Sequence, residues 1–373
     1  SVRRKSEPLD GQRFEVVVIG AGMAGLAAAL RLAMFDRDVL LLERHYVVGG
    51  LNSFFAKASR KFDVGLHAVT NYPPKNAGKA SPLLRLCRQL RISFDELSLA
   101  QQSFSRIAFP DADLRFDNDF SFFLSEVERI FPAERDRFRN LLGAMEAFDA
   151  YSPQVSGDVS TRSVLAEHLR DPLLIEMLLC PTCYYGSAVE NDIDFAGFVM
   201  LFDAIFRQGL ARPYDGIRRL LDPILQRYDD LGGQRRMNLG VRSIVTDGEK
   251  ADRLELDNGE TIFADHVIST CGAVETERML SGSSPNECDS DVGRISILES
   301  ITVFEGQPSG LGWEETIVFY NDAETFRYEC PDDLTDVRSG VICIPNNYRY
   351  SNGRSLPEGQ LRVTCLANHD DWS

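Results

Sequence analysis

Three glycines near the amino terminus have the spacing that a dinucleotide-binding turn requires. Gly20, Gly22 and Gly25 follow a β-branched run that ends at Ile19. The first glycine permits a tight turn, the second lets backbone approach a phosphate, and the third lets a helix pack closely on the strand. N–H groups at the start of that helix attract phosphate oxygens. The spacing therefore predicts a pyrophosphate site.

An acidic residue after the next apolar run supports this interpretation. Residues 38–43 end in Glu43, which follows Gly25 by 18 residues. A carboxylate about 20 residues after the glycines accepts hydrogen bonds from an adenosine ribose. Together these signals predict a cofactor with an ADP moiety. The alternative is an ordinary β-α-β unit with a glycine-rich turn.

Further candidate residues follow Glu43. The pair Gly49 and Gly50 would let the chain pass closely over a second part of a cofactor, although a plain turn also uses glycines. His67 is the histidine that we select as a catalytic candidate, because an imidazole with a pKa near neutral can transfer a proton or set the polarity of a site. The alternative for His67 is a hydrogen-bonded structural role.

The eight cysteines show no disulfide framework, which predicts a reducing, cytoplasmic location. Cys180 and Cys183 form a C-x-x-C pair, but no second pair or histidine stands at a spacing suited to a metal. We therefore expect no metal site. Two buried thiols are the favoured interpretation of this pair, and a redox pair is the alternative.

Composition limits the classes of function. The chain has 373 residues, of which 44% are hydrophobic, so it can bury a sizeable core and form two domains. The net charge of −16 argues against nucleic-acid binding and against simple electrostatic docking on anionic lipid. No apolar stretch reaches the roughly 18 residues that a membrane span needs.

Hydrophobic periodicity outlines the elements that would position these residues. Residues 81–180 are predicted to be mostly helical, and apolar residues at helical spacing predict an amphipathic helix over 192–206. That helix either packs in the core or forms the wall of an apolar tunnel or a membrane-dipping face. A helix over 217–231, a hairpin turn at residues 257–259 and a strand-rich stretch over 295–365 complete the pattern.

These motifs, in this order and with an Asp-x-Gly motif at Asp63 to Gly65 and Val-Ile-Ser-Thr-Cys-Gly at 267–272, resemble those of FAD-dependent amine-oxidase-like flavoproteins. Within that group the chain is similar to the phytoene desaturase, carotenoid isomerase and retinol saturase branch. The resemblance implies an α/β fold with a Rossmann-like FAD-binding domain (GR2-type) and a discontinuous substrate domain of mixed sheet plus helical insertion. The implied boundaries are an FAD-binding domain at 14–85 and 210–290, a helical substrate or lid insertion at 86–209, and a substrate-domain sheet at 291–373.

The resemblance also implies roles for individual residues. Glu43 would bind the adenosine ribose, the backbone of Val241 would contact the adenine edge, and Leu66 and His67 would pass the isoalloxazine ring. The residues implied in FAD binding are Gly20, Ala21, Gly22, Met23, Ala24, Gly25, Glu43, Arg44, Gly49, Gly50, Leu51, Asn52, Val241 and Gly272.

Two features depart from the family pattern. Asp215 stands where these proteins often carry the first glycine of a Gly-Gly pair, before Gly216. The Gly-Asp segment that closes the flavin site in this group is not found before Ser373. The sequence therefore predicts a substrate domain that is incomplete at its C-terminus.

The function implied by the resemblance is oxidation or reduction of a long apolar isoprenoid, by hydride transfer with flavin N5. Aromatic residues such as Phe54, Phe55, Phe195, Phe198 and Phe202 would line an apolar channel. We expect an apolar small-molecule substrate, no nucleic-acid partner, and peripheral membrane contact that gives partial partition into lipid vesicles. Amine oxidation, a redox-neutral isomerisation, and a prenyl-binding escort of the same fold without FAD are the alternatives.

Overall fold

The computed structural model describes residues 7–65, 67–73, 81–152, 159–248, 250–280 and 292–372. The chain divides into two compact units. The first unit comprises residues 1–66, 84–98 and 215–292, and the second comprises 67–83, 99–214 and 293–373. Residues 84–98 thus lie with the glycine turn, although the sequence places most of them in the helical insertion.

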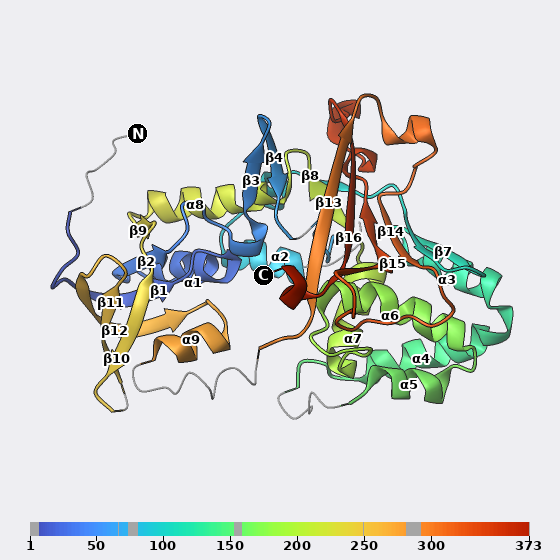
Figure 1. The fold of residues 1–373 in the computed structure, drawn as a ribbon, viewed down its shortest axis with the longest axis horizontal. Coiled ribbons are helices and arrows are strands. Elements are labelled where there is room, and N and C mark those ends of the chain that lie inside the picture. Colours follow the sequence, from blue (N-terminus) through green and yellow to red (C-terminus); the bar gives the residue numbers. More distant parts are fainter. Residues whose placement is uncertain are drawn as a thin grey trace. The chain divides into compact units, whose positions relative to one another are not determined.

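The first unit is built on a mixed sheet with the strand order β10-β11-β12-β1-β2-β9 (Figure 1). Its central strands pair in parallel, and β10 and β11 extend it in antiparallel pairing. The strands are β1 (Arg13–Ile19), β2 (Val39–Glu43), β9 (Gln234–Met237), β10 (Val241–Thr246), β11 (Ala251–Leu256) and β12 (Thr261–Ser269). Burial of β1 and β2 explains their continuous apolar runs, because parallel strands are covered on both faces.

Helices and a small hairpin complete the first unit. The predicted turn at residues 257–259 is confirmed, since it joins β11 to β12 and Gly259 has a φ of +89°. The remaining elements are α1 (Met23–Ala33), η1 (Gly50–Asn52), β3 (Phe54–Lys57), β4 (Arg60–Asp63), α2 (Pro82–Gln89, from residue 84 in this unit), η2 (Phe94–Leu97), η5 (Ile217–Leu220), α8 (Leu221–Asp230) and α9 (Ala273–Met279).

The second unit has its own mixed sheet, ordered β13-β16-β15-β14-β6-β7, and a separate pair of β5 and β8. The strands are β5 (Leu99–Gln101), β6 (Ser105–Ala108), β7 (Asp113–Phe116), β8 (Ala211–Pro213), β13 (Ser296–Phe304), β14 (Ile317–Asn321), β15 (Thr335–Cys343) and β16 (Gly359–Ala367). Helical elements of this unit are α3 (Phe120–Ile130), η3 (Pro132–Glu134), α4 (Arg135–Ala147), α5 (Thr161–His168), α6 (Pro172–Gly186), α7 (Phe195–Phe202), η4 (Asp203–Arg207), η7 (Pro308–Leu311), η8 (Pro345–Asn347), η9 (Ser351–Gly353) and η10 (His369–Trp372).

The prediction that residues 81–180 are mostly helical is confirmed by α2, α3, α4 and α5, but it missed the three strands over 99–116, β5, β6 and β7. These strands have three or four residues each, too few to show a clear alternation of apolar and polar side chains. β5 and β6 also have partners far along the chain, β8 and β14, whereas β7 pairs with the neighbouring β6. Helix α6 was not predicted, because its central residues are buried on every side and so lack amphipathic spacing.

The amphipathic helix predicted over 192–206 exists and packs in the core. Asp194 caps α7, and the helix continues as the π-helical turn η4. Phe198, Phe202 and Phe206 are fully buried, and their rings contact one another. The favoured interpretation of this helix as a core element is therefore confirmed.

Two glycines on helices give a prediction about stability. Gly143 is exposed on α4, and a Cβ there would meet nothing within 4 Å, so we expect Gly143→Ala to stabilise the protein by about 0.5–1 kcal/mol. Gly197 on α7 is the contrasting case, because its Cβ would lie 2.7 Å from the capping carboxylate of Asp194. Urea denaturation should show opposite signs for Gly143→Ala and Gly197→Ala. Equal shifts would contradict the placement of these helices.

No helix in the described ranges is both long and apolar enough to cross a bilayer.

Candidate functional site

The glycine turn lies between β1 and α1, as its spacing predicts. Gly20 has a φ of +97°, and a Cβ on Gly25 would lie 1.9 Å from the backbone oxygen of Gly20. A Cβ on Gly22 would instead meet nothing within 4 Å, and Gly22 caps α1 without a side-chain hydrogen bond. Gly25 thus serves helix–strand packing, while Gly22 faces open space at the start of the helix. Met23 and Ala24 form its first turn.

A threonine at the end of β12 supports the turn from the other side. The hydroxyl of Thr270 donates to the backbone oxygens of Ile19, at 2.9 Å, and Gly20, at 3.2 Å. A Cβ on Gly20 would lie 2.8 Å from this hydroxyl oxygen. Gly272 follows with a φ of +97° and begins α9. Gly272 was selected from sequence, whereas the contact of Thr270 with the turn was not.

Glu43 connects the end of β2 to the glycine turn. Its Oε2 accepts the backbone N–H of Ala21 at 2.8 Å, and its Oε1 accepts that of His45 at 2.7 Å. Each carboxylate oxygen keeps a further lone pair, so the group can still accept hydrogen bonds from ribose hydroxyls. Gly49 has a φ of +119° and donates its N–H to the oxygen of Ala21 at 2.8 Å. The structure therefore brings Ala21, Glu43 and Gly49 together.

The other residues implied in cofactor binding lie in the same unit. Arg44 is exposed directly after β2, and Leu51 and Asn52 lie in η1. Val241 begins β10, and the segment before it runs along Glu43, since the Leu239 N–H donates to the Glu43 backbone oxygen at 2.9 Å. A pocket of about 360 Å³ adjoins Glu43. It is lined by Glu43, His45, Tyr46, Val47, Gly50, Ser53, Phe54, Phe55 and Val64.

This arrangement fits the ADP half of FAD. The open space before Gly22 admits a phosphate to backbone N–H groups, and Gly50 lies close enough that its Cβ would be 3.6 Å from the Gly22 Cα. Glycine at both positions keeps this approach free of Cβ atoms. Leu66, implied beside the flavin ring, lies outside the described residues.

Asp63 ties the Asp-x-Gly motif to the residues around Gly216. Its buried carboxylate accepts the Ile217 N–H at 3.0 Å and a guanidinium N–H of Arg218 at 3.2 Å. Gly216 has a φ of +101°, and a Cβ there would lie 2.5 Å from this carboxylate. Asp215 is exposed and faces none of this crowding. The departure from Gly-Gly is therefore accommodated, because only the second position requires glycine.

His67 meets a buried charged cluster in the second unit. Its Nε2 lies 2.9 Å from the Thr364 hydroxyl and 3.2 Å from Glu299 Oε1. Glu299 in turn accepts two hydrogen bonds from Arg362, at 2.8 and 2.6 Å, and the Arg362 side chain is 1% exposed. A guanidinium N–H of Arg212 donates to the His67 backbone oxygen at 2.6 Å.

The expectation of a near-neutral pKa for His67 is wrong. Burial, and then the charges of Arg362 and Arg212, hold its pKa well below the usual value. The Glu299 carboxylate can only accept, so Nε2 carries the proton of the neutral imidazole. Nδ1 is buried and finds no hydrogen-bond partner among the described residues. His67 is thus suited to accept a hydrogen bond, and its catalytic role stays a prediction.

The low pKa of His67 predicts a pH dependence of stability. Below the unfolded pKa of about 6.5 the unfolded chain binds a proton that the folded chain does not, so stability falls as the pH falls towards the folded pKa. Between pH 6.5 and 5 this difference reaches up to about 2 kcal/mol. His67→Gln should remove it, as measured by urea denaturation at both pH values. His369→Gln, which removes an exposed histidine, is the control, and an identical slope in His67→Gln and wild type would contradict the prediction.

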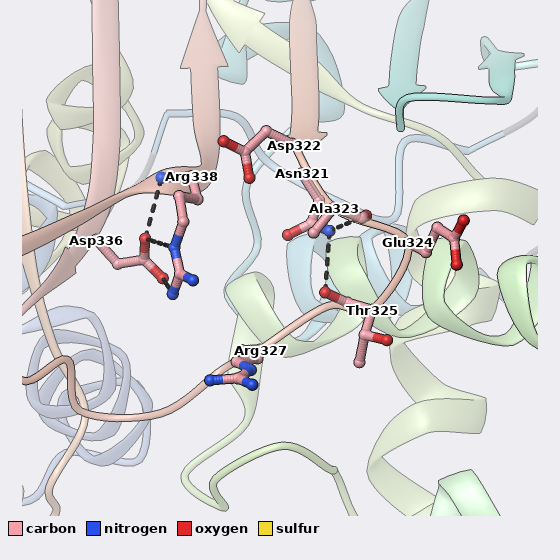
Figure 2. A pocket seen from close by; sticks show the side chains of 8 residues that line it. All are labelled: Asn321, Asp322, Ala323, Glu324, Thr325, Arg327, Asp336 and Arg338. Atoms are coloured by element: carbon pink, nitrogen blue, oxygen red, sulfur yellow. Dashed lines mark hydrogen bonds and ion pairs between the residues drawn. The ribbon is translucent and has the colours of Figure 1, made fainter.

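A second pocket, of about 310 Å³, lies where β14 leads towards β15 (Figure 2). Its lining is polar, and Asp336 accepts hydrogen bonds from the backbone and guanidinium of Arg338. Asn321 donates to the backbone oxygens of Ala323 and Thr325 and so fixes the loop. This pocket does not have the character of an apolar channel.

The C-x-x-C pair lies on α6. Cys180 and Cys183 are free thiols and are almost completely buried. Burial raises the pKa of both, that of Cys180 well above its usual value. The interpretation as buried thiols is confirmed.

Comparison with known proteins agrees with the geometry of the glycine turn. The chain is 23% identical over 304 residues to prolycopene isomerase 2 of an Oncidium hybrid cultivar, covering 72% of this chain and 50% of the relative. It is 25% identical over 292 residues to the lycopene-forming phytoene desaturase of Pantoea ananas, covering 72% and 58%. The chain thus spans about half the length of the curated relatives it matches.

A solved oxidoreductase from Methanosarcina mazei shares the fold, with a TM-score of 0.69 at 15% identity over 96% of this chain and 80% of that one. This likeness confirms the predicted fold class. The family model for flavin containing amine oxidoreductase matches residues 23–368, which confirms the prediction of FAD as cofactor. The protein belongs to the flavin-containing amine oxidoreductase family.

Proposed function

We propose that the full-length protein is an FAD-dependent oxidoreductase that acts on a long apolar isoprenoid, such as a carotenoid, squalene-type or retinoid molecule. The observation that carries this proposal is the match of 72% of the chain to a prolycopene isomerase and to a phytoene desaturase. The geometry around Gly22 and Glu43 supports the FAD-binding part of the proposal independently of those relatives.

The residues of the first unit would hold the cofactor. Backbone N–H groups at the start of α1 would bind the pyrophosphate, and Glu43 would accept hydrogen bonds from the ribose. FAD, when bound, supplies hydride transfer at N5. The chain provides binding and orientation, and its glycines keep side chains away from the phosphates.

The second unit would provide a dry environment. Phe195, Phe198 and Phe202 were expected to line a channel, but their rings pack against one another in the core of this unit. His67 would supply a neutral imidazole whose Nδ1 lone pair can accept a hydrogen bond from an N–H or O–H donor while the ring stays uncharged.

A colour test and a reduction test check this proposal. The full-length protein should carry flavin absorbance, and anaerobic addition of carotenoid, squalene-type or retinoid substrates should bleach it. A colourless protein would contradict the proposal and favour a non-flavin escort role. Bleaching by amines alone would instead favour amine oxidation.

A redox-neutral isomerisation is the second candidate, favoured by the match to prolycopene isomerase. Conversion of a cis-carotenoid by the pre-reduced protein, with no net change in flavin absorbance, would distinguish it from desaturation.

A further inference from the structure

The hairpin of β3 and β4 carries a local charge opposite to that of the whole chain. Residues 54–63 read FFAKASRKFD, with Lys57, Arg60 and Lys61 and one acidic residue, Asp63, which is buried and paired with Arg218, whereas the net charge of the chain is −16. The turn and both lysines are exposed, and Phe55 is 41% exposed. Figure 1 shows the hairpin extending beyond α1 and α8 of the same unit. The hairpin is therefore a basic, exposed element of a chain with a net negative charge.

The strand register places like charges directly opposite each other. Lys57 pairs with Arg60 across the hairpin, and cross-strand pairs of like charge are destabilising. The two turn residues, Ala58 and Ser59, have φ values of 49° and 63°, a region that glycine or asparagine adopts more cheaply. The hairpin thus has two locally unfavourable features within four residues, a like-charged pair and two non-glycine residues with positive φ. Such features are expected where a function compensates for the lost stability.

The same register gives the hairpin an amphipathic face. Phe55 lies opposite Phe62, with ring centres 5.5 Å apart, and Lys57 and Arg60 follow two residues away on the same face. On the other face the Lys61 ammonium lies 4.8 Å from the centre of the Phe54 ring. The exposed ring of Phe55 thus lies next to the cationic pair of Lys57 and Arg60 on the same face of the hairpin.

We propose that the β3–β4 hairpin docks on an anionic phospholipid surface. Lys57 and Arg60 contact headgroup phosphates, and Phe55, on the same face of the hairpin, reaches the boundary between headgroups and acyl chains. Lys61 lies on the other face and adds to the local positive charge. The negative charge of the whole chain does not prevent this contact. A four-residue strand is about 13 Å long, which exceeds the Debye length of about 8 Å at physiological salt, so charges behind the hairpin are largely screened at its tip.

Vesicle sedimentation of the full-length protein tests the proposal. The protein should pellet with vesicles of phosphatidylcholine and phosphatidylglycerol in equal parts at about 0.1 M salt, and should be released at about 1 M salt, where the Debye length is about 3 Å. It should remain in the supernatant with phosphatidylcholine alone. Equal binding to both vesicles would overturn the proposal, as would displacement from the mixed vesicles by soluble glycerol phosphate.

Two triple variants separate local docking from net charge. Lys57→Gln/Arg60→Gln/Lys61→Gln should weaken vesicle binding about 100-fold. The matched control, Arg135→Gln/Arg137→Gln/Arg139→Gln, removes the same charge from α4 and should bind as wild type. Equal losses in both variants would overturn the hairpin as the docking surface. Retention of wild type by an acidic protein or nucleic acid column, without vesicle binding, would do the same.

A single variant guards against misfolding as the cause. Lys57→Glu places an acid opposite Arg60, so it should raise the midpoint of thermal unfolding while lowering vesicle binding. Loss of binding in a more stable protein cannot come from unfolding. The docking proposal does not depend on which substrate the protein uses. Flavin absorbance, measured on the same samples, tests the proposed function separately from vesicle binding.

Discussion

Gly25→Ala is expected to destabilise the protein by about 3 kcal/mol and to abolish FAD binding. The new Cβ would lie 1.9 Å from the backbone oxygen of Gly20, which cannot move without displacing the turn. Overpacking of a rigid site costs about 1–3 kcal/mol, and a backbone neighbour places this case at the upper end. Urea denaturation of the apoprotein and titration with FAD would measure the two effects.

Gly22→Ala should separate binding from folding. Its Cβ would meet nothing within 4 Å and its φ of −70° suits alanine, so stability should fall only by the roughly 1 kcal/mol or less of a poorer N-cap. The methyl group would occupy the approach of the phosphate, so FAD affinity should fall at least about tenfold, which corresponds to 1.4 kcal/mol. Wild-type affinity in Gly22→Ala would show that the phosphate does not approach this residue.

Local signals were sufficient for the first part of the fold. The strand, turn, helix and second strand from Arg13 to Glu43 are adjacent in sequence, and each is fixed by neighbouring residues. The contacts of Ala21 with Glu43 and Gly49 belong to the same local β-α-β arrangement. The chain returns to the glycine turn within about 20–30 residues, so these contacts are also short in sequence. The grouping of the candidate ADP-binding residues could therefore be predicted, and their roles in binding stay predictions.

Contacts between distant segments could not be predicted in this way. Thr364 lies 297 residues after His67, and no spacing rule brings them together. The burial that lowers the pKa of His67 comes from that cluster, so its sign was not accessible from sequence. The register of the β3–β4 hairpin could not be predicted from sequence either, because only the observed pairing shows that Lys57 lies opposite Arg60.

The link between Asp63 and Arg218 lies between these extremes. The Asp-x-Gly motif was recognised, but its partner 155 residues away was not. The glycine at position 216 offered a signal in the sequence, because a glycine before a helix often marks a close approach. The structure shows that the approaching group is the Asp63 carboxylate.

Asp63→Ala is expected to destabilise the first unit by about 3–5 kcal/mol. It would leave the Arg218 guanidinium, 20% exposed, without this carboxylate and would remove the acceptor of the Ile217 N–H. Asp63→Asn keeps an acceptor and should cost less, about 1–2 kcal/mol. Urea denaturation of the apoprotein measures both.

A double variant and a surface control test the cause of this loss. Asp63→Ala/Arg218→Met removes both charges, so it should recover part of the stability lost in Asp63→Ala. Asp222→Ala breaks the exposed ion pair of Asp222 with Arg219 and should cost less than about 1 kcal/mol. If Asp63→Ala cost no more than Asp222→Ala, the buried pair would not hold this part of the unit together. A double variant no more stable than Asp63→Ala would place the loss in the hydrogen bond to Ile217 instead, because that bond is absent from both.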